Sequence, residues 1–403
     1  MDPTVNEWLS LVLRWLHIIT GIAWIGSSFF FMWLDARLVN PTRPRPQVES
    51  EIWLVHSGGF YLTERRSLKP GEMPRELHWF KWEAAFTWIS GFALLTVAYY
   101  LGAGVVLARP DGPIGDSGWG VAVGLATLVL GWLIYDFLWT SPLGRMTWPP
   151  IVASFALLVG VAFLLTWLLD GRAAFLHVGA MLGTIMAANV WVRILPAQQV
   201  MIDATKAGRE FDPAPGMAAK KRSVHNNYMT LPVLFLMISN HYPATYGAEF
   251  NWAILIVMFL VGAGVRHYFN IRHQPGVFAA WIWLPAAAAV VALMVVTMPE
   301  PLPRSAVAST ETATAQGVPF ASVQAVLQRH CVPCHAARPA NPGFDKPPKN
   351  VMFESPAQVV AAAPRIYQQA IARDVMPLGN QTGMTAEERA LIGRWIADGA
   401  RVE

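Results

Sequence analysis

The chain has 403 residues, of which 54% are hydrophobic and 14% charged, and it contains 18 tryptophans. This composition is far more apolar than that of a soluble protein of the same length. The formal net charge is only +4, which gives no reason to invoke nucleic acid. The composition therefore predicts a protein embedded in a lipid bilayer, with no nucleic-acid partner.

Eight segments are long and apolar enough to cross a hydrocarbon layer of about 30 Å. They lie at roughly 8–34, 82–107, 119–139, 150–169, 173–195, 227–246, 250–269 and 277–298. The first lacks a basic leader and a small-residue cleavage site, so we expect a retained span and not a signal peptide. After Pro299 the hydropathy falls sharply. We expect an all-α chain with an eight-helix transmembrane bundle at 1–298, a flexible linker at 299–317 and a small soluble domain at 318–403.

Basic residues are distributed unevenly between the predicted loops. They are dense in the loop at 35–81 and again between Lys206 and Arg222, whereas the opposite loops carry little more than Arg109 and Arg172. The positive-inside rule places the basic loops in the cytoplasm. With an even number of spans, both termini and the soluble domain then lie on the opposite side, outside the inner membrane.

A Cys-x-x-Cys-His run from Cys331 through Cys334 to His335 contains both cysteines of the chain. This run is the attachment site of a c-type haem, in which the thiols form thioethers with the porphyrin and the imidazole ligates the iron. A redox dithiol or half of a zinc site would leave the histidine unexplained and would lack a second pair of ligands. Haem c is attached outside the cytoplasm, which agrees with the orientation that the loops predict.

The soluble domain has the pattern of a small monohaem cytochrome c. Apolar residues at helical spacing in 320–327 run into the haem motif. Thr385 to Glu388 is a capping box that opens a terminal helix, and the apolar face of that helix consists of Leu391, Ile392, Trp395 and Ile396. Met376 is the expected sixth ligand of the iron, with Met384 as second choice; the alternative role is a core methionine filling a gap. A thioether ligand raises the potential of the iron, which suits an electron acceptor.

Two histidines lie inside predicted spans, where ionisable side chains are costly and usually functional. His17 in the first span and His177 in the fifth each follow a leucine, and both fall in the outer half of the membrane. Small residues on the same helix faces allow close approach of a flat cofactor or another helix. The pair has two interpretations: the histidines are iron ligands of a second, non-covalent haem b, or they are core histidines that form interhelical hydrogen bonds or stand alone.

Polar and aromatic residues gather at the predicted cytoplasmic ends of the spans. They occur at 56–61, at 78–83, at Asn189 and Arg193, at 225–228 and at 266–267. Amide, guanidinium and imidazole groups beside aromatic rings suit a flat, anionic, hydrogen-bonding heterocycle. For any single residue the ordinary alternative is an anchor at the membrane interface. For the cluster as a whole we expect a binding site.

Four blocks of sequence resemble a known family. They are the run from Trp15 to Gly26, the Leu-His-Trp-Phe-Lys-Trp-Glu block at 77–83, the His-Asn-Asn-Tyr block at 225–228 and the haem motif. Together they resemble the bacterial membrane-bound urate oxidases (urate hydroxylases), which join an eight-span domain to a C-terminal cytochrome c. The resemblance covers essentially the whole chain. It implies oxidation of urate to 5-hydroxyisourate, with electrons leaving through the cytochrome c and not reducing oxygen to peroxide. The first helix is also similar to helices of other small haem-binding membrane families, which favours a haem at His17.

Under this resemblance the cytoplasmic cluster takes specific roles. Lys81, Glu83 or His225 is the expected proton acceptor, and the expected ring binders are Asn189, Arg193, Asn226 and Asn227. Urate loses two electrons, whereas one haem accepts one at a time, so the enzyme must stabilise a urate radical or contain a second redox centre. A cytoplasmic substrate site would also lie a membrane's thickness from a periplasmic haem, which favours an intermediate carrier.

Two other classes of function stay open. In the first, the membrane domain is a quinol-oxidising or electron-conducting anchor that feeds the cytochrome. In the second, it is a transporter with a fused redox sensor. If the protein oxidises urate or quinol, the electrons pass on to the respiratory chain through a cytochrome oxidase or a soluble cytochrome. Reduction of the haem by urate, by quinol or by neither distinguishes the three.

Overall fold

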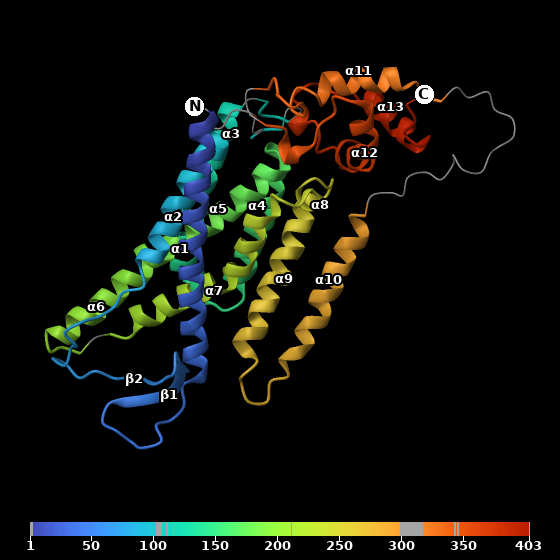
Figure 1. Cartoon of the computed structure of the whole chain (residues 1–403). Helices are drawn as coiled ribbons and strands as arrows, with labels where there is room; N and C mark the ends of the chain where they lie inside the picture. The colour runs from blue at the N-terminus through green and yellow to red at the C-terminus, as the bar shows by residue number, and fades with distance from the viewer. Residues whose placement is uncertain are drawn as a thin grey trace.

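The structure is a computed structural model that describes residues 3–101, 107–109, 112–115, 117–210, 212–298, 317–341, 344 and 346–402. Long helices form a bundle, and a smaller C-terminal module packs across the end of the bundle where the N-terminus lies (Figure 1). The linker expected at 299–317 falls, except for Gly317, outside the described residues, as do residues 102–106 of the second expected span.

Each of the eight expected spans corresponds to helix in the bundle. The elements are α1 (Pro3–Arg37), α2 (Trp82–Leu95) with a π-helical turn (Thr96–Tyr100), α3 (Ser117–Thr140), α4 (Pro149–Leu168), α5 (Gly171–Ala188), α6 (Leu195–Lys206), α7 (Ala214–Ser239), α8 (Pro243–Tyr246), α9 (Asn251–Ile271) and α10 (Trp283–Val296). The sixth span was predicted to begin at residue 227, but α7 already begins at Ala214, since its first half is a polar, basic extension of the apolar segment.

Six helical segments of the described chain have the length and apolar character needed to cross a membrane. They are Thr4–Arg37, Gly118–Thr140, Pro149–Leu168, Gly171–Lys206, Asn251–Ile271 and Ala279–Val296. The two others, α2 with its π turn (residues 82–100) and α7, are not among these six; the first half of α7 is polar and carries Lys220, Lys221 and Arg222. Both nevertheless pack within the bundle, α2 against α1 and α7 against α5 and α9. These helices are consistent with a membrane protein.

The helix α5 forms the centre of the bundle. Ala173, Ala174, Phe175 and Val178 on it have no exposed surface, and α5 packs against α3, α4 and α7. Helices approach closely where one of them carries glycine. A Cβ added to Gly179 of α5 would lie 3.0 Å from Leu236 of α7, so this contact depends on the missing side chain.

A π-helical segment, Asn189–Ile194, joins α5 to α6 without a break in the helix. Pro196, within the first turn of α6, lacks an N–H and crowds the preceding turn, which gives a physical reason for the wider turn before it. The result is that Asn189 lies buried where the helix widens. The sequence analysis had placed the end of the fifth span here and had not predicted α6.

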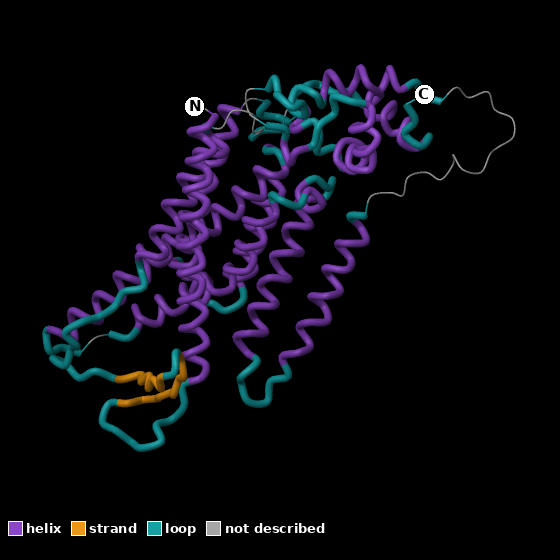
Figure 2. Tube along the Cα trace, in the orientation of Figure 1, coloured by secondary structure: helices purple, strands orange, loops and turns teal. Residues whose placement is uncertain are grey.

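The basic loop between α1 and α2 contains a β-hairpin that the all-α expectation missed. Antiparallel strands β1 (Val48–His56) and β2 (Gly59–Arg66) are joined by Ser57 and Gly58, whose φ angles of 49° and 77° are those of a tight hairpin turn. The 56–61 run therefore forms this turn and does not belong to a binding cluster. The hairpin lies at the opposite end of the bundle from the C-terminal module (Figure 2).

The C-terminal module has its own core, formed by α11 (Phe320–His330), α12 (Pro356–Ile366) and α13 (Ala386–Ala397). As predicted, α11 packs against α13, and the Phe320 and Trp395 rings are 5.6 Å apart. The capping box is confirmed: Thr385 Oγ1 accepts from the backbone N–H of Glu388, whose carboxylate accepts from that of Thr385. Ile392, Trp395 and Ile396 are buried, as their spacing predicted.

Candidate functional site: a polar pocket in the bundle and a haem motif outside it

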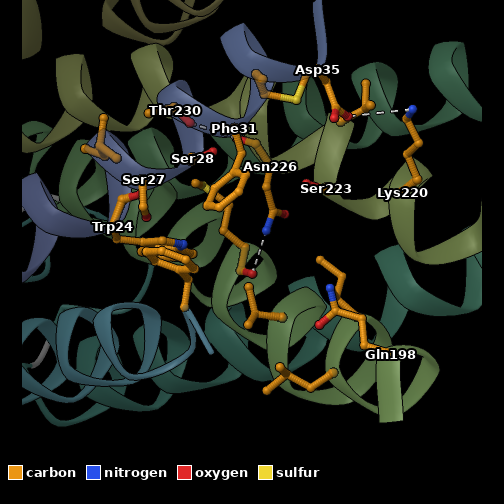
Figure 3. Close-up of a pocket in the computed structure, with 18 of the residues that line it drawn as sticks. Trp24, Ser27, Ser28, Phe31, Asp35, Gln198, Lys220, Ser223, Asn226 and Thr230 are labelled. Carbon is orange, nitrogen blue, oxygen red and sulfur yellow. Dashed lines mark hydrogen bonds and ion pairs between the residues drawn. The ribbon is translucent and has the colours of Figure 1, made fainter. Parts of the chain in front are cut away.

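A pocket of about 620 Å³ lies near the end of the bundle that carries the hairpin. It is formed by the C-terminal part of α1, the loop before α2, the segment from α5 to α6, and α7 with the end of α9. Its aromatic lining residues are Trp24, Phe31, Trp79 and Phe80, and its polar ones are Ser27, Ser28, Asp35, His78, Gln198, Lys220, Ser223, Asn226, Thr230 and Asn270. Figure 3 shows Asn226 among these side chains and the Asp35–Lys220 ion pair at one edge. The volume is in the range typical of small-molecule sites.

Several polar groups in this pocket have no hydrogen-bond partner within the described chain. Ser28, His78, Gln198 and Ser223 make none, although all four line the pocket. Ser28 and Ser223 are half-buried, and His78 and Gln198 are exposed, so all four can bond to water or to a ligand in the pocket. They come from α1, the loop before α2, α6 and α7, so a ligand there would contact four separate parts of the chain.

Asn226 is the one predicted ring binder that lines the pocket. Its Nδ2 donates to the Met186 carbonyl at 2.9 Å, and its Oδ1 accepts from Asn189 Nδ2 at 2.8 Å. Asn189 is fully buried, and its Nδ2 also lies 3.2 Å from the Tyr135 hydroxyl. These bonds fix the orientation of the Asn226 amide, so Asn189 positions a ligand-binding group and does not contact the pocket itself.

Asn227 lies behind the pocket wall. Its Oδ1 accepts two hydrogen bonds of 2.9 Å, one from Arg266 Nε and one from Asn270 Nδ2. Asn270 lines the pocket, whereas Asn227 has no exposed surface. Asn227 therefore supports the α9 side of the pocket in the way that Asn189 supports the α5 side.

The remaining predicted residues lie outside the pocket lining. Arg193 binds Asp136 with two hydrogen bonds, one of 2.8 Å from Nε, and Arg222 shares the same carboxylate. His225 points toward α3, where its Nδ1 is 2.7 Å from the Tyr135 hydroxyl. Their side chains form a second polar cluster, around Asp136, beside the pocket.

Lys81 and Glu83 lie at the start of α2. The Lys81 ammonium lies over the rings of Trp79 and Trp82, at 5.3 and 5.5 Å. One carboxylate oxygen of Glu83 is buried without a hydrogen-bond partner. Trp79 lines the pocket, so Lys81 is close to it through that ring, but neither charged group is part of the lining.

Five residues that line the pocket were not predicted to do so from the sequence: Trp24, Ser28, Asp35, Gln198 and Lys220. A signal existed on α1: Trp24, Ser28 and Met32 recur every four residues, and Asp35 is a carboxylate at the end of an apolar helix. Lys220 was interpreted only as part of a basic orientation signal. Its role at the pocket depends on α7 beginning well before the apolar segment.

The model of a known protein family, described as urate oxidase N-terminal, matches residues 3–298. The chain belongs to this family. The match covers the whole helical bundle, including the pocket, and membership indicates a urate-related oxidoreductase. A search of curated proteins and a search of solved structures each found no match.

In this member of the urate oxidase N-terminal family, the two intramembrane histidines have different surroundings. His17 Nδ1 bonds to the Thr87 carbonyl at 2.9 Å, and its ring lies against Gly91. His177 is fully buried; its Nδ1 bonds to the Ala173 carbonyl at 2.7 Å and its Nε2 to the Tyr100 hydroxyl at 3.0 Å. The two rings contact opposite parts of α2 and its π turn, and both nitrogens of His177 are engaged. These contacts favour interhelical hydrogen bonds over a shared haem.

The haem motif follows α11 directly. The thiols of Cys331 and Cys334 are unpaired, and His335 Nδ1 donates to the Val351 carbonyl at 2.9 Å. That bond leaves Nε2 as the iron-binding nitrogen and fixes the ring, as for a typical ligating histidine. Burial raises the pKa of Cys331 to about 12 and raises that of Cys334, whereas a redox dithiol needs a lowered thiol pKa. The residues present therefore fit a covalently attached haem better than a dithiol.

The two candidate methionines differ in burial. Met384 is 3% exposed within the core of the module, whereas Met376 is half-buried and packs against the edge of that core. Arg389 Nη1 donates to the Met376 carbonyl at 2.7 Å and so positions the loop that carries it. Within the described residues no group of three or more His, Cys, Asp or Glu is placed to hold a metal ion.

Proposed function

We propose that this protein is an integral-membrane enzyme that oxidises urate to 5-hydroxyisourate and passes the electrons to a haem c on its own C-terminal module. In this reaction a urate monoanion and one water give 5-hydroxyisourate, one proton and two electrons. The observation that carries the proposal is the open pocket of polar and aromatic side chains at the hairpin end of the bundle, within the residues that the urate oxidase family matches. The haem motif on the same chain supplies a reason why the electrons leave through iron and not to oxygen as peroxide.

The lining suits the urate ring. Asn226, in its fixed orientation, offers donor and acceptor positions to a heterocycle edge, and Ser28 and Gln198 offer further hydrogen bonds. Trp24, Trp79 and Phe31 supply aromatic faces for stacking. His78 is the imidazole that lines the pocket, so we place it ahead of His225, Lys81 and Glu83 as the proton acceptor.

The electron path follows from where the two sites lie. Between Pro3 and Trp24, α1 rises about 30 Å at standard helical pitch. The C-terminal module is at the Pro3 end and the pocket begins at Trp24 (Figure 1). A haem held by Cys331, Cys334, His335 and Met376 would take up electrons one at a time and deliver them to a soluble cytochrome or an oxidase. The separation favours a carrier in between or a closer approach of the substrate.

The proposal includes an orientation: the protein lies in a bacterial inner membrane, with its termini and its C-terminal module in the periplasm. The N-terminus and the C-terminal module share one end of the bundle, and the basic hairpin loop lies at the other (Figure 1). That arrangement is what the positive-inside rule and extracytoplasmic haem attachment both require.

The test is anaerobic mixing of the purified, haem-loaded protein with urate. We expect the ferric haem to become reduced without added mediator, and Asn226→Ala to slow this reduction while dithionite still reduces the variant fully. A pyridine haemochrome measurement on the same sample counts c-type and b-type haem and so tests the second haem at His17 and His177. An unchanged spectrum after urate, in protein that dithionite does reduce, would contradict the proposal.

A second pocket favours the alternative function, quinol oxidation. It has a volume of about 720 Å³ and lies between the bundle and the C-terminal module, with Trp167, Trp252, Arg109, Asp170 and Val375 in its lining. Aromatic walls with a few polar groups suit a quinone ring, and Val375 is adjacent to Met376. Reduction of the haem by a quinol analogue but not by urate would decide for this function.

A further inference from the structure

Arg266 on α9 is a buried cation without an acidic partner. It is 6% exposed, and its guanidinium lies 3.7 Å from the ring centre of Phe29 and donates through Nε to Asn227. In the part of the chain that the structure describes, it forms no ion pair with Asp or Glu. The other basic residues nearby do have partners: Arg193 and Arg222 bind Asp136, and Lys220 is paired with Asp35.

An uncompensated buried charge is expensive, more so near a membrane interior. Such a group persists where something pairs with it in the working state of the protein. The terminal nitrogens of Arg266 have no hydrogen-bond partner among the described residues, and they are not among the completely enclosed polar atoms. They therefore retain the capacity to act on a ligand.

The position of Arg266 points to the pocket as the place of that ligand. Asn270, one turn further along α9, lines the pocket and shares the Asn227 oxygen with Arg266. Phe29, on which the guanidinium stacks, directly follows Ser28, which also lines the pocket. Arg266 thus lies immediately behind the wall that α1 and α9 form.

The charged side chains in and directly behind the pocket wall have a net charge of +1. Asp35 and Lys220 line the pocket and neutralise each other, with their nearest N–O distance at 3.8 Å. Arg266 adds a positive charge that no carboxylate of the lining offsets. The Arg266 guanidinium is itself buried, so water screens its charge less than that of an exposed residue, and it acts over several ångströms without direct contact.

We propose that Arg266 is the charge-recognition residue of the pocket, which selects an anionic ring over a neutral one of the same shape. This inference rests on the proposed function for the identity of the ligand as urate, which is a monoanion at neutral pH. Phe29 and Asn227 position the guanidinium, and a bound anion supplies the compensating charge that no carboxylate of the lining offers.

The experiment compares Arg266→Met and Arg266→Lys with the matched control Arg272→Met, which removes an exposed arginine near the end of the same helix. The first readout is the urate concentration that gives half-maximal rate of anaerobic haem reduction. We expect Arg266→Met to raise it about thirty-fold or more, the effect of removing one partner of a buried charge pair. Arg266→Lys keeps the charge, so we expect a smaller rise, and Arg272→Met should match the parent protein.

The second readout is thermal stability without and with ligand, using urate and the neutral purine hypoxanthine as probes. Without ligand, Arg266→Met should melt at or above the parent's temperature, since an uncompensated charge has gone, and its stabilisation by urate should be lost. A purely structural role predicts the reverse: a lower melting temperature and an unchanged half-saturating concentration of urate. Equal stabilisation of the parent protein by urate and by hypoxanthine would also overturn the inference.

These outcomes separate the inference from the proposed function. If urate reduces the haem and Arg266→Met has the parent's half-saturating concentration, the charge-recognition role is wrong and urate oxidation stands. If urate does not reduce the haem of the parent protein, the proposed function is wrong. Stabilisation by urate that depends on Arg266 would then still support an anion site, and its absence would refute both.

Discussion

The four consecutive residues from His225 to Tyr228 contact three different helices. His225 bonds to Tyr135 on α3, Asn226 to Asn189 at the end of α5, and Asn227 and Tyr228 to Arg266 and His267 on α9. Successive residues of an α-helix are rotated by about 100°, so neighbours in sequence face different directions. A contiguous polar motif on a buried helix therefore organises several contacts, and one of its members, Asn226, reaches the pocket.

At the same scale, the two methionines of the C-terminal module allow a direct test of the iron ligand. We expect Met376→Ala to lower the reduction potential of the haem, because a thioether ligand raises it, and to leave the core of the module intact. Met384→Ala should keep the potential and destabilise the module by about 2–5 kcal/mol, because it leaves a cavity in the core. Potentiometric titration and denaturant unfolding of the two variants measure these effects. A lowered potential in Met384→Ala alone would reverse the assignment.

At the scale of elements, the contact between α3 and α5 depends on glycine. A Cβ on Gly124 would lie 2.5 Å from His177 Nε2 and 2.7 Å from the Tyr100 hydroxyl. Both rings are held by their mutual hydrogen bond of 3.0 Å, so neither moves aside without loss. The close approach of α3 to α5 and the hydrogen bond between His177 and Tyr100 therefore both depend on Gly124.

We expect Gly124→Ala to destabilise the bundle by about 1–3 kcal/mol, the usual cost of overpacking. The matched control is Gly160→Ala on α4, where an added Cβ meets nothing within 4 Å. In that variant the higher helix propensity of alanine should leave stability unchanged or raise it by up to about 1 kcal/mol. Thermal unfolding in detergent compares the two. Equal melting temperatures would show that α3 and α5 do not depend on this contact.

The capping box of α13 predicts a pH dependence. The backbone N–H of Thr385 holds the pKa of Glu388 below its usual value, helped by His330 and Arg329, while burial opposes the shift. The folded module therefore favours the ionised carboxylate. Its contribution to stability is complete above the unfolded value of about 4.5 and is lost as the pH falls through and below that value.

Glu388→Gln keeps a side-chain oxygen for the Thr385 N–H but cannot titrate. We expect its unfolding free energy to depend less steeply on pH between neutrality and pH 3 than that of the parent protein. Denaturant unfolding at a series of pH values measures this, with Asp398→Asn as a control for the loss of one negative charge. Parallel curves for Glu388→Gln and the parent would refute the assigned role.

At the scale of the whole molecule, the pocket and the haem motif lie at opposite ends of the bundle. The pocket with its excess positive charge lies toward the hairpin end, and the haem motif belongs to the module at the N-terminal end (Figure 1). Under the proposed function, this separation means that electrons, and not the substrate, cross the molecule.

The orientation can be measured with reporter fusions. Alkaline phosphatase, which is active only in the periplasm, should be active when fused after Val402. A green fluorescent protein inserted at the Ser57–Gly58 turn should fluoresce, because this exposed hairpin turn is expected in the cytoplasm. Phosphatase activity at the hairpin turn would contradict the topology and, with it, the site of haem attachment.

The sequence by itself determined the features that depend on neighbours along the chain. The Cys-x-x-Cys-His motif is readable because its three groups act within one turn, and the capping box because its bonds join residues three apart. Apolar runs revealed the helices of the bundle because their length has to match the membrane. Asn189 and Asn226, which the sequence placed in one region, do lie together: their side chains are joined by a hydrogen bond of 2.8 Å.

Only the tertiary structure decided which side chains form the pocket. Ser28, His78, Gln198, Ser223 and Asn270 come from five segments far apart in sequence, and they meet through the rotation of each helix about its axis. That rotation is set by packing: by the glycines that allow close approach, by the π segment before α6 and by the early start of α7. Hydropathy records the depth of a residue in the membrane but not the direction it faces among similar helices. For this reason His225 and Arg193, at the expected depth, turned out to face the Asp136 cluster and not the pocket.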